Sequence, residues 1–501
     1  MTNRCSHSWS KRENQSSRIN CYVSGSTNQM ILSTTIAIIG SSIPMGYGMG
    51  VLNSPQAIIR IWIQEAMTKK FGIIMSNRQN LMMWSTVISI FLIGCALGGL
   101  KGGTLADKVG RRRAFLINYF ICMTSCGMFT LCIVFHAVQI LLTSQLLFGI
   151  SAGISSVLVP VYLSEIETDS FRGMAVIHAF GISLGMFISE ICGMDILLGS
   201  AKLWPCLLCI PGLMTLISLL LYPYLQESPV FIAFTQEDTV QRKHLLINNQ
   251  NDKNLEKECL LSTESINTYQ SEPEKYSIYM LFKERSLHKP IFLTIVLYMN
   301  TVFSGINAIV AFGNLIFTSA GLNQQESQIA SICATGLRCI MGVVAILLVK
   351  KCRRRPVILC AFGGCIVSLA MLMSSLCYHS TVATYMAILS CVLYFISYAT
   401  GIGALACAIS VELLPKNPKP YVMSLATGLY WLCNILVGTT FPLIQNTLGV
   451  FSLLFFIFYC IVSATILYFH LPETFNKFSV TENKNDVPDM IDKSSYLPIA
   501  N

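Results

Sequence analysis

Apolar stretches of about 20 residues recur along this sequence, and each is long enough to cross a bilayer as a helix. They lie near residues 31–51, 81–100, 115–135, 138–163, 174–198, 204–224, 290–312, 328–349, 357–377, 383–411, 421–443 and 449–470. Charged residues make up only 12% of the chain, against about 25% in soluble domains. The sequence therefore predicts an all-α membrane protein with twelve transmembrane helices.

Polar stretches divide these runs into two groups of six. The first 30 residues lack the apolar core and cleavage site of a secretory signal, so the run at 31–51 is expected to stay in the protein as a span. The predicted parts are an N-terminal tail at 1–30, a six-helix half at 31–224, a connector at 225–289, a second six-helix half at 290–475 and a C-terminal tail at 476–501.

Basic residues gather in two short connections, after the second and the eighth run. They are Lys101, Lys108, Arg111, Arg112 and Arg113 in one connection, and Lys350, Lys351, Arg353, Arg354 and Arg355 in the other. Short loops rich in Lys and Arg stay in the cytosol, so the connector and both termini are expected there. The net charge of +9 thus indicates membrane orientation and a lipid bilayer as partner, with no nucleic acid.

Three charged loop features recur at nearly one offset along the chain. Arg112 and Arg355 are 243 positions apart, Glu165 and Glu412 are 247 apart, and Glu227 and Glu473 are 246 apart. Two halves related in this way are typical of transporters that bind their substrate between the halves.

The connection after the second run reads Gly103-Thr-Leu-Ala-Asp107-Lys108-Val-Gly110-Arg111-Arg112. It resembles the signature loop of the major facilitator superfamily. Other loops resemble the sugar-porter branch of that superfamily. They are Pro160-Val-Tyr162-Leu-Ser-Glu165 with Arg172-Gly173, Gln226-Glu227-Ser228-Pro229, and Leu471-Pro472-Glu473-Thr474. The resemblance implies the major facilitator fold. It also implies a cytosolic gate made by Asp107, Arg111, Arg112, Glu165, Arg172, Arg354, Arg355 and Glu412.

Motifs inside the runs resemble the facilitative glucose transporters, and this resemblance covers about residues 34–474. They are Gly46-Tyr47, Asn53-Ser-Pro55-Gln56, Ser304-Gly305-Ile306-Asn307-Ala308, and Trp431-Leu-Cys-Asn434-Ile-Leu-Val-Gly438. The resemblance makes Asn307, Trp431 and Asn434 the expected sugar contacts. The alternative is structural: Asn307 caps an unwound part of its span and Trp431 only packs.

Several positions depart from that family's sugar-binding pattern. They are Ala179, Thr301, Val302, Arg338, Ala399, Cys407 and Tyr430. The second signature loop also differs, because Lys350 and Arg353 stand where the family has an acid and a glycine. The resemblance alone therefore does not make glucose the substrate.

Arg338 lies 12 residues before Lys350, roughly 18 Å along a helix and well inside the membrane. A charge there should face a partner or a wet cavity. Glu190 on the fifth run is the candidate partner, with a height mismatch of roughly 7 Å. The alternative places Glu190 in water on the outer side and leaves Arg338 alone in the cavity.

These features predict a multi-pass transporter of the plasma membrane that moves a hexose such as glucose by alternating access. The first run contains no acid, whereas proton-coupled relatives usually carry an Asp there, so uniport is favoured. No zinc spacing or phosphate-binding loop is evident, so we expect no metal, no cofactor and no enzyme activity. Two alternatives stay open: transport of another small, anionic solute drawn by Arg338, and a non-transporting, sensor-like paralogue.

Overall fold

The computed structural model describes residues 27–168, 173–194, 196–233, 235, 281, 283–306, 309, 324–378, 380–415 and 418–474, and every regular element in them is a helix. The first half contains α2 (Thr27–Ala37), the π-helix η1 (Ile38–Ser42), α3 (Ile43–Gly50), α4 (Gln56–Phe71), α5 (Asn77–Val109), α6 (Arg111–Val134), α7 (Val138–Ile166), α8 (Ala175–Cys192), α9 (Trp204–Leu220) and the short η3 (Tyr222–Tyr224). The elements α2, η1 and α3 follow one another without a break, as one interrupted span.

The second half contains α13 (Arg285–Phe303), α15 (Gln324–Lys351), α16 (Arg354–Cys377), α17 (Thr381–Ser397), the π-helix η4 (Tyr398–Ile402), α18 (Gly403–Leu413), α19 (Lys419–Leu448), η5 (Gly449–Ser452) and α20 (Leu453–His470). Within the described residues, ten helical runs are long and apolar enough to cross a membrane. The helices α9 and α13 occupy the sixth and seventh predicted spans. The prediction of an all-helical fold with twelve spans is thereby confirmed.

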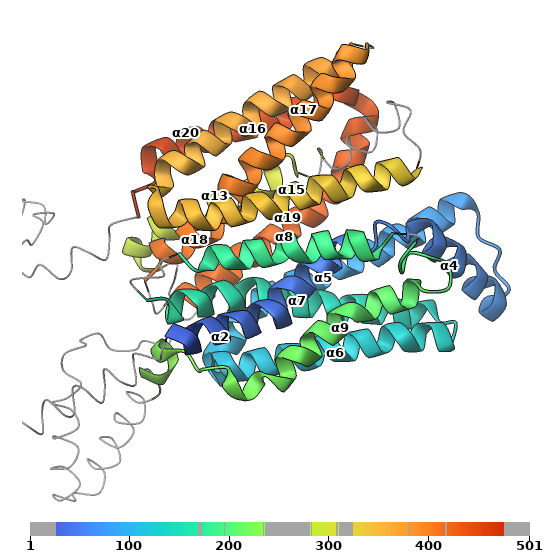
Figure 1. The fold of residues 1–501 in the computed structure, drawn as a ribbon, viewed down its shortest axis with the longest axis horizontal. Coiled ribbons are helices and arrows are strands. Elements are labelled where there is room, and N and C mark those ends of the chain that lie inside the picture. The colour runs from blue at the N-terminus through green and yellow to red at the C-terminus, as the bar shows by residue number, and fades with distance from the viewer. Residues whose placement is uncertain are drawn as a thin grey trace, which may run out of the picture.

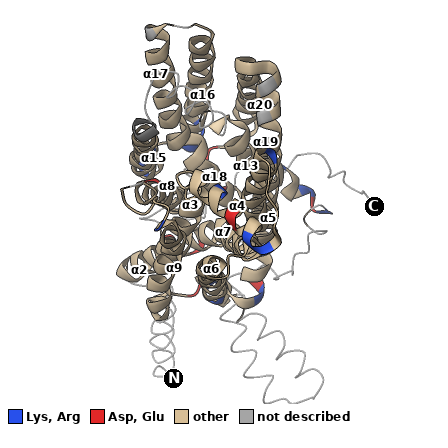
Figure 2. Cartoon of the chain, turned by 90° about the vertical axis from the view of Figure 1, so that its right-hand side faces the viewer, with Lys and Arg blue, Asp and Glu red and all other residues tan. Residues whose placement is uncertain are grey.

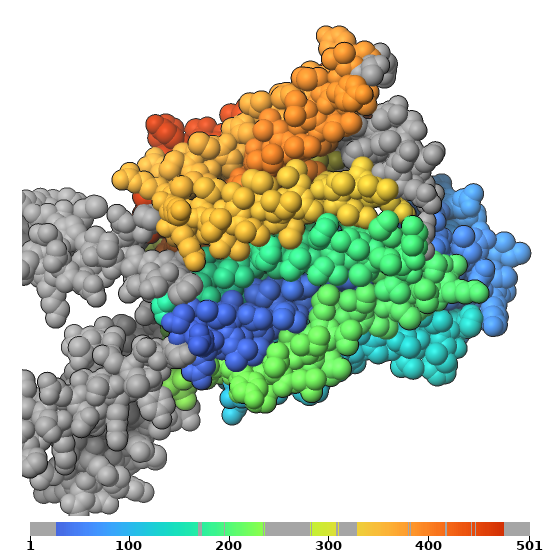
Figure 3. Space-filling view, viewed as in Figure 1, coloured from blue at the N-terminus to red at the C-terminus, as the bar shows by residue number. Residues whose placement is uncertain are grey.

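The two halves lie side by side along a seam (Figure 1), in which α8 packs along α15 and α5 packs along α19. In the space-filling view the yellow surface of α15 rests directly on the green surface of α8 (Figure 3). Charged residues are few on the helices (Figure 2). Large apolar side chains such as Phe292, Leu347 and Phe458 stand on the outer surface instead, as a bilayer requires.

The tightest helix crossing of the first half joins α5 to α7 through glycines. A Cβ added at Gly98 would lie 2.2 Å from the carbonyl oxygen of Ile150, and one at Gly153 would lie 2.2 Å from that of Cys95. Glycines at such a crossing let the two helix backbones approach closely. In lipid, van der Waals packing between helices rather than the hydrophobic effect drives their association. This crossing fixes α7, which carries Ser156 and Glu165.

Two spans contain a π-helical turn, η1 in the first and η4 in the tenth. Such turns widen the helix by one residue and often mark functional sites. The segment Tyr398–Ile402 interrupts the tenth span without a proline. The connection after the first span contains α4, which carries Arg60, Lys69 and Lys70.

Gly153→Leu is expected to destabilise the first half, because the new side chain has no room at the crossing with Cys95. Overpacking of this kind costs about 1–3 kcal/mol or more, so the melting temperature of the detergent-solubilised protein should fall, together with its surface expression. Gly127→Leu on α6 is the matched control, because a Cβ there meets nothing within 4 Å. Equal melting temperatures for the two variants would contradict a close approach of α5 and α7 at Gly153.

Candidate functional site

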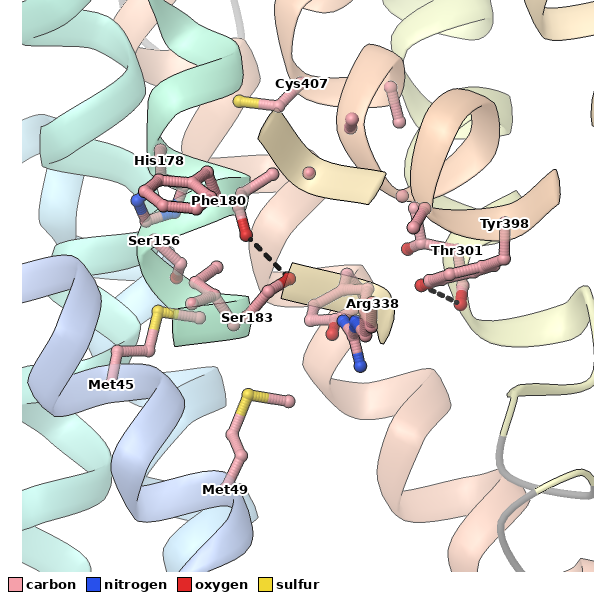
Figure 4. Close-up of a pocket in the computed structure, with 18 of the residues that line it drawn as sticks. Met45, Met49, Ser156, His178, Phe180, Ser183, Thr301, Arg338, Tyr398 and Cys407 are labelled. Atoms are coloured by element: carbon pink, nitrogen blue, oxygen red, sulfur yellow. Dashed lines mark hydrogen bonds between the residues drawn. The ribbon is translucent and has the colours of Figure 1, made fainter. Parts of the chain in front are cut away.

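A cavity of about 100 Å³ lies on the seam between the two halves, roughly midway along the spans. The first half contributes side chains from α3, α7 and α8, and the second half contributes side chains from α13, α15, η4, α18 and α19 (Figure 4). Both π-helical turns adjoin it: Tyr398 belongs to η4, and Ser42 of η1 contacts the lining residue His178. A change of helix geometry in either turn would therefore reshape the cavity.

The cavity wall gathers most of the positions at which the sequence departs from the glucose-transporter pattern. Ala179, Thr301, Arg338, Ala399, Cys407 and Tyr430 all line it. Five of these six residues come from the second half, and only Ala179 comes from the first. The departures are therefore concentrated on one wall of one cavity.

The polar groups at the wall are mostly held by hydrogen bonds. Ser183 Oγ donates to the carbonyl oxygen of Ala179 at 3.1 Å, and Tyr398 Oη donates to that of Thr301 at 3.2 Å. His178 Nδ1 and Ser42 Oγ lie 2.8 Å apart. These bonds orient the hydroxyl groups and the imidazole ring before any ligand arrives.

Arg338 presents its guanidinium at the cavity wall (Figure 4). Its Nη1 donates to the thioether sulfur of Met186 at 3.5 Å, and its Cζ lies 5.6 Å from the centre of the Tyr398 ring. No carboxylate of the described residues lies within ion-pair distance of it. Its closest described contacts are therefore an aromatic ring and a weak acceptor.

The predicted direct pair of Glu190 with Arg338 is not formed in this structure. The carboxylate of Glu190 accepts a hydrogen bond from Thr335 Oγ1 at 3.0 Å. Thr335 lies one turn before Arg338 on α15, and Met186 lies one turn before Glu190 on α8. Each charged group thus contacts a neighbour of the other, as the height mismatch along the two helices implies.

Trp431 and Asn434, two predicted sugar contacts, do not line the cavity in this arrangement. The indole of Trp431 is fully buried, and its Nε1 donates to Ser156 Oγ at 3.3 Å across the seam. Asn434 Nδ2 donates to the carbonyl oxygen of Tyr430 at 2.9 Å. The third predicted contact, Asn307, lies outside the described residues. Tyr430, which does line the cavity, packs against Trp431, with their ring centres 4.9 Å apart.

At one end of the first half, Arg111 joins three helices. Its guanidinium donates to both oxygens of Glu165 at 2.8 and 2.9 Å and lies 2.8 Å from the carboxylate of Asp107. The backbone amides of Arg111 and Arg112 donate to Glu227, so this carboxylate caps the first turn of α6. The Arg112 side chain does not reach Glu165; it donates to the Pro223 carbonyl oxygen and lies over Tyr222.

The second half repeats this arrangement at the same end of the molecule. Arg354 Nη2 donates to Glu412 at 3.2 Å, and the amides of Arg354 and Arg355 donate to Glu473 at 3.0 and 3.4 Å. The side chain of Arg355 turns to the Tyr468 carbonyl oxygen and ring instead of Glu412. The repeated loop features predicted from the sequence thus make equivalent contacts.

Each of these ion pairs lies within one half, so they do not themselves join the two halves. The halves meet beside them through Lys419 Nζ, which donates to Ser164 Oγ at 3.2 Å, and through the Gly103 amide, which donates to Ser424 Oγ at 2.7 Å. The predicted gate residue Arg172 lies outside the described residues. At this charged end, two hydrogen bonds between described residues therefore link the halves, one from an ammonium and one from a backbone amide.

Glu167 at the end of α7 is a site residue that the sequence did not reveal. Its carboxylate accepts hydrogen bonds from the amides of Gly173 and Met174 at 3.0 and 3.3 Å, and burial raises the pKa of this carboxyl group. It holds the loop before α8, where a Cβ at Gly173 would lie 2.3 Å from Val349 of the other half. The only available signal was its place two residues after Glu165.

Comparison with known proteins agrees with this architecture. The family described as Sugar (and other) transporter matches residues 33–481. The chain is 28% identical over 450 residues to "Solute carrier family 2, facilitated glucose transporter member 7" of Mus musculus, which covers 89% of this chain and 87% of that protein. It is also 28% identical over 462 residues to member 5 of Homo sapiens, with 91% of each chain covered.

The fold is also found among solved structures. The proton:xylose symporter XylE of E. coli, bound to 6-bromo-6-deoxy-D-glucose, matches with a TM-score of 0.73 at 19% identity, covering 90% of this chain and 97% of XylE. Among the described residues, no group of His, Cys, Asp or Glu converges as metal ligands would. The chain is a membrane transport protein rather than an enzyme, and it belongs to the sugar transporter family of the major facilitator superfamily.

Proposed function

We propose that this chain is a facilitative carrier of a hexose, which it moves by opening the central cavity alternately to the two sides of the plasma membrane. The observation that carries the proposal is the position of the cavity on the seam, with walls from both halves. When the two halves rotate against each other, a site between them is exposed to one side of the membrane and then to the other. The glucose-transporter names of the relatives support a sugar as substrate.

The chemistry of the wall supports a sugar as well. A sugar ring offers an apolar face and a rim of hydroxyl groups. Tyr398 and Tyr430 supply aromatic surface, while Ser183, Thr301 and Thr427 supply hydroxyl groups that both donate and accept hydrogen bonds. A site that is mostly apolar with a few oriented polar groups is the usual form of a small-molecule pocket.

Uniport is supported by the distribution of acids. No Asp or Glu is among the described residues that line the cavity, and none lies in the first span between Thr27 and Gly50. A proton-coupled carrier needs a titratable group that senses both the substrate and the proton. The imidazole of His178 lines the cavity but is held by Ser42, and the acid Glu190 hydrogen-bonds Thr335 outside the cavity wall.

The small volume of the cavity supports alternating access rather than a standing channel. Pockets for small molecules usually measure about 300–1,000 Å³, whereas this cavity measures about 100 Å³. Substrate therefore binds only when the halves move apart. The basic loops favour a cytosolic charged end. We accordingly infer that the tails at 1–30 and 476–501 and the connector at 225–289 are cytosolic, and that this arrangement is closed towards the cytosol.

Trp431 and Asn434 remain proposed participants in substrate binding. In a wider cavity, movement of Tyr430 would expose the indole behind it. The bond from Trp431 to Ser156 crosses the seam, so separating the halves would also release the Nε1 donor for a substrate hydroxyl.

Uptake of radiolabelled hexose by cells that lack endogenous carriers tests the proposal. The wild-type chain should raise uptake down the gradient without a proton requirement. Ala179→Phe should abolish that uptake at unchanged surface expression, because its ring fills a cavity of about 100 Å³. Ile340→Phe is the control, since Ile340 is 63% exposed on the outer face of α15. Absence of uptake by a surface-expressed wild-type chain would overturn the proposal.

Gly103→Leu should hold the charged end open. A Cβ at Gly103 would lie 2.1 Å from the Pro420 carbonyl oxygen across the seam, so α5 and α19 could no longer meet there. Cys407 lines the cavity and serves as reporter: in inside-out vesicles, an impermeant maleimide should modify it faster than in the wild type, as measured by peptide mass spectrometry.

The control for this variant is Gly438→Leu on α19, where a Cβ meets nothing within 4 Å. It should leave the modification rate of Cys407 at the wild-type value. If Gly103→Leu also leaves that rate unchanged, the charged end is not the gate on that side.

A further inference from the structure

Arg338 is the only charged residue among the described side chains that line the cavity. A positive charge deep in a membrane protein is costly, and it is usually retained facing a cavity or a partner of opposite charge. The structure supplies the cavity without the partner: no carboxylate of the described residues pairs with this guanidinium. The site is therefore electrostatically incomplete when empty.

The contacts that Arg338 does make leave most of its hydrogen-bonding capacity for a ligand. A guanidinium carries several N–H donors in a planar fork. Among the described residues, the only hydrogen-bond acceptor it contacts is the sulfur of Met186, at 3.5 Å, and thioether sulfur is a weak acceptor. The Cζ of Arg338 lies 5.6 Å from the centre of the Tyr398 ring, a contact with the ring that uses no hydrogen-bond acceptor.

Glu190 makes no ion pair with Arg338. Its carboxylate is bound by Thr335 at 3.0 Å, it is not part of the cavity wall, and Met186 occupies the place on α8 that faces the guanidinium. A carboxylate brought by a ligand would meet the fork of Arg338 directly. Planar bidentate pairing of a guanidinium with a carboxylate is the strongest interaction available to this side chain.

When the halves move apart, the remaining wall residues would meet the sugar ring beside that carboxylate. Tyr430 and Tyr398 offer aromatic faces, and the hydroxyl groups of Thr301 and Ser183 are near enough to line the same cavity. A solute with a carboxylate on a hydroxylated ring would pair with Arg338 and also contact the aromatic rings and hydroxyl groups of the wall. A neutral hexose would contact the rings and hydroxyl groups only.

We propose that the cavity binds and transports sugar acids, hexose-sized monovalent anions of the hexuronate class, with the carboxylate paired to Arg338. This inference rests on the proposed carrier function and specifies its substrate class. Transport of such an anion without a coupled ion moves one negative charge across the membrane. It is therefore driven by the membrane potential.

Proteoliposomes of the full chain, given radiolabelled D-glucuronate or D-glucose, test this directly. With an inside-positive potential of 100 mV set by a potassium gradient and valinomycin, glucuronate should accumulate up to about 50-fold, because each charge gains about 2.3 kcal/mol. Glucose should only equilibrate. Accumulation of glucuronate that follows a pH gradient and ignores the potential would overturn the uncoupled anion transport proposed here.

Substitutions at Arg338 then test whether its positive charge sets the preference for glucuronate over glucose. The ratio of glucuronate to glucose uptake should fall about tenfold or more in Arg338→Gln, since a hydrogen-bonded charge is lost. Arg338→Lys should keep part of the ratio, because it keeps the charge and loses the fork. Arg113→Gln is the matched control: it removes the same charge from an exposed position on α6 and should leave the ratio unchanged.

The outcomes separate this inference from the proposed function. Glucose uptake without glucuronate uptake or inhibition overturns the sugar-acid site and leaves the hexose carrier standing. Glucuronate uptake without glucose uptake supports the site and overturns the hexose proposal. Uptake of neither substrate by folded, reconstituted protein overturns both. An unchanged ratio in Arg338→Gln overturns the role of Arg338.

Discussion

In the alternating-access mechanism proposed above, the seam between the two halves closes and opens, and two buried ion pairs of the described residues lie within the halves rather than across this seam. Arg111 with Glu165, and Arg354 with Glu412, each join helices of one half. Arg111 and Glu165 are both at most 3% exposed, and breaking a buried pair by removing one partner costs about 3–5 kcal/mol. These pairs therefore make each half rigid at its charged end.

The contacts that cross the seam are weaker in kind. A backbone amide meets a hydroxyl at Gly103 and Ser424, an indole meets a hydroxyl at Trp431 and Ser156, and an ammonium meets a hydroxyl at Lys419 and Ser164. A neutral hydrogen bond contributes about 1 kcal/mol net. A few such bonds break at modest cost. The two halves are therefore able to separate at the seam, while the ion pairs within each half keep that half intact.

The repeat between the halves is close in position but not identical in chemistry. Arg111 has two carboxylates, Asp107 and Glu165, and its Nη1 also donates to the Ala106 carbonyl oxygen. The position equivalent to Asp107 is Lys350, and the Arg354 side chain donates to Glu412 and to the carbonyl oxygens of Val349 and Cys352. The contact of Arg354 with Val349 repeats that of Arg111 with Ala106, so the second half keeps the geometry of the loop although a lysine stands in place of the first half's acid.

Much of this arrangement could be predicted from particular residues. The apolar runs predicted the helices, and the matched spacing of Glu227 and Glu473 predicted two related loops, in which the structure shows two equivalent helix caps. Other features depend on competition between neighbours that the sequence does not rank. The Arg112 side chain donates to the Pro223 carbonyl oxygen rather than to Glu165, and Glu190 accepts a hydrogen bond from Thr335 rather than from Arg338. The amino-acid composition of Tyr398–Ile402 does not indicate the π-helical turn found there.

The cavity shows why a family resemblance predicts the place of a site better than its ligand. Backbone packing sets the place, and the spans of the two halves keep that packing even where side chains change. The ligand is decided by a few wall residues. Here Ala399 and Cys407 bring small or weakly polar groups to the wall, and Arg338 is the one charged side chain among the described residues that line it. A charge in a protein interior is less screened than one in water. A substitution at such a wall position therefore changes the chemistry offered to a ligand while the backbone packing that places the cavity stays the same.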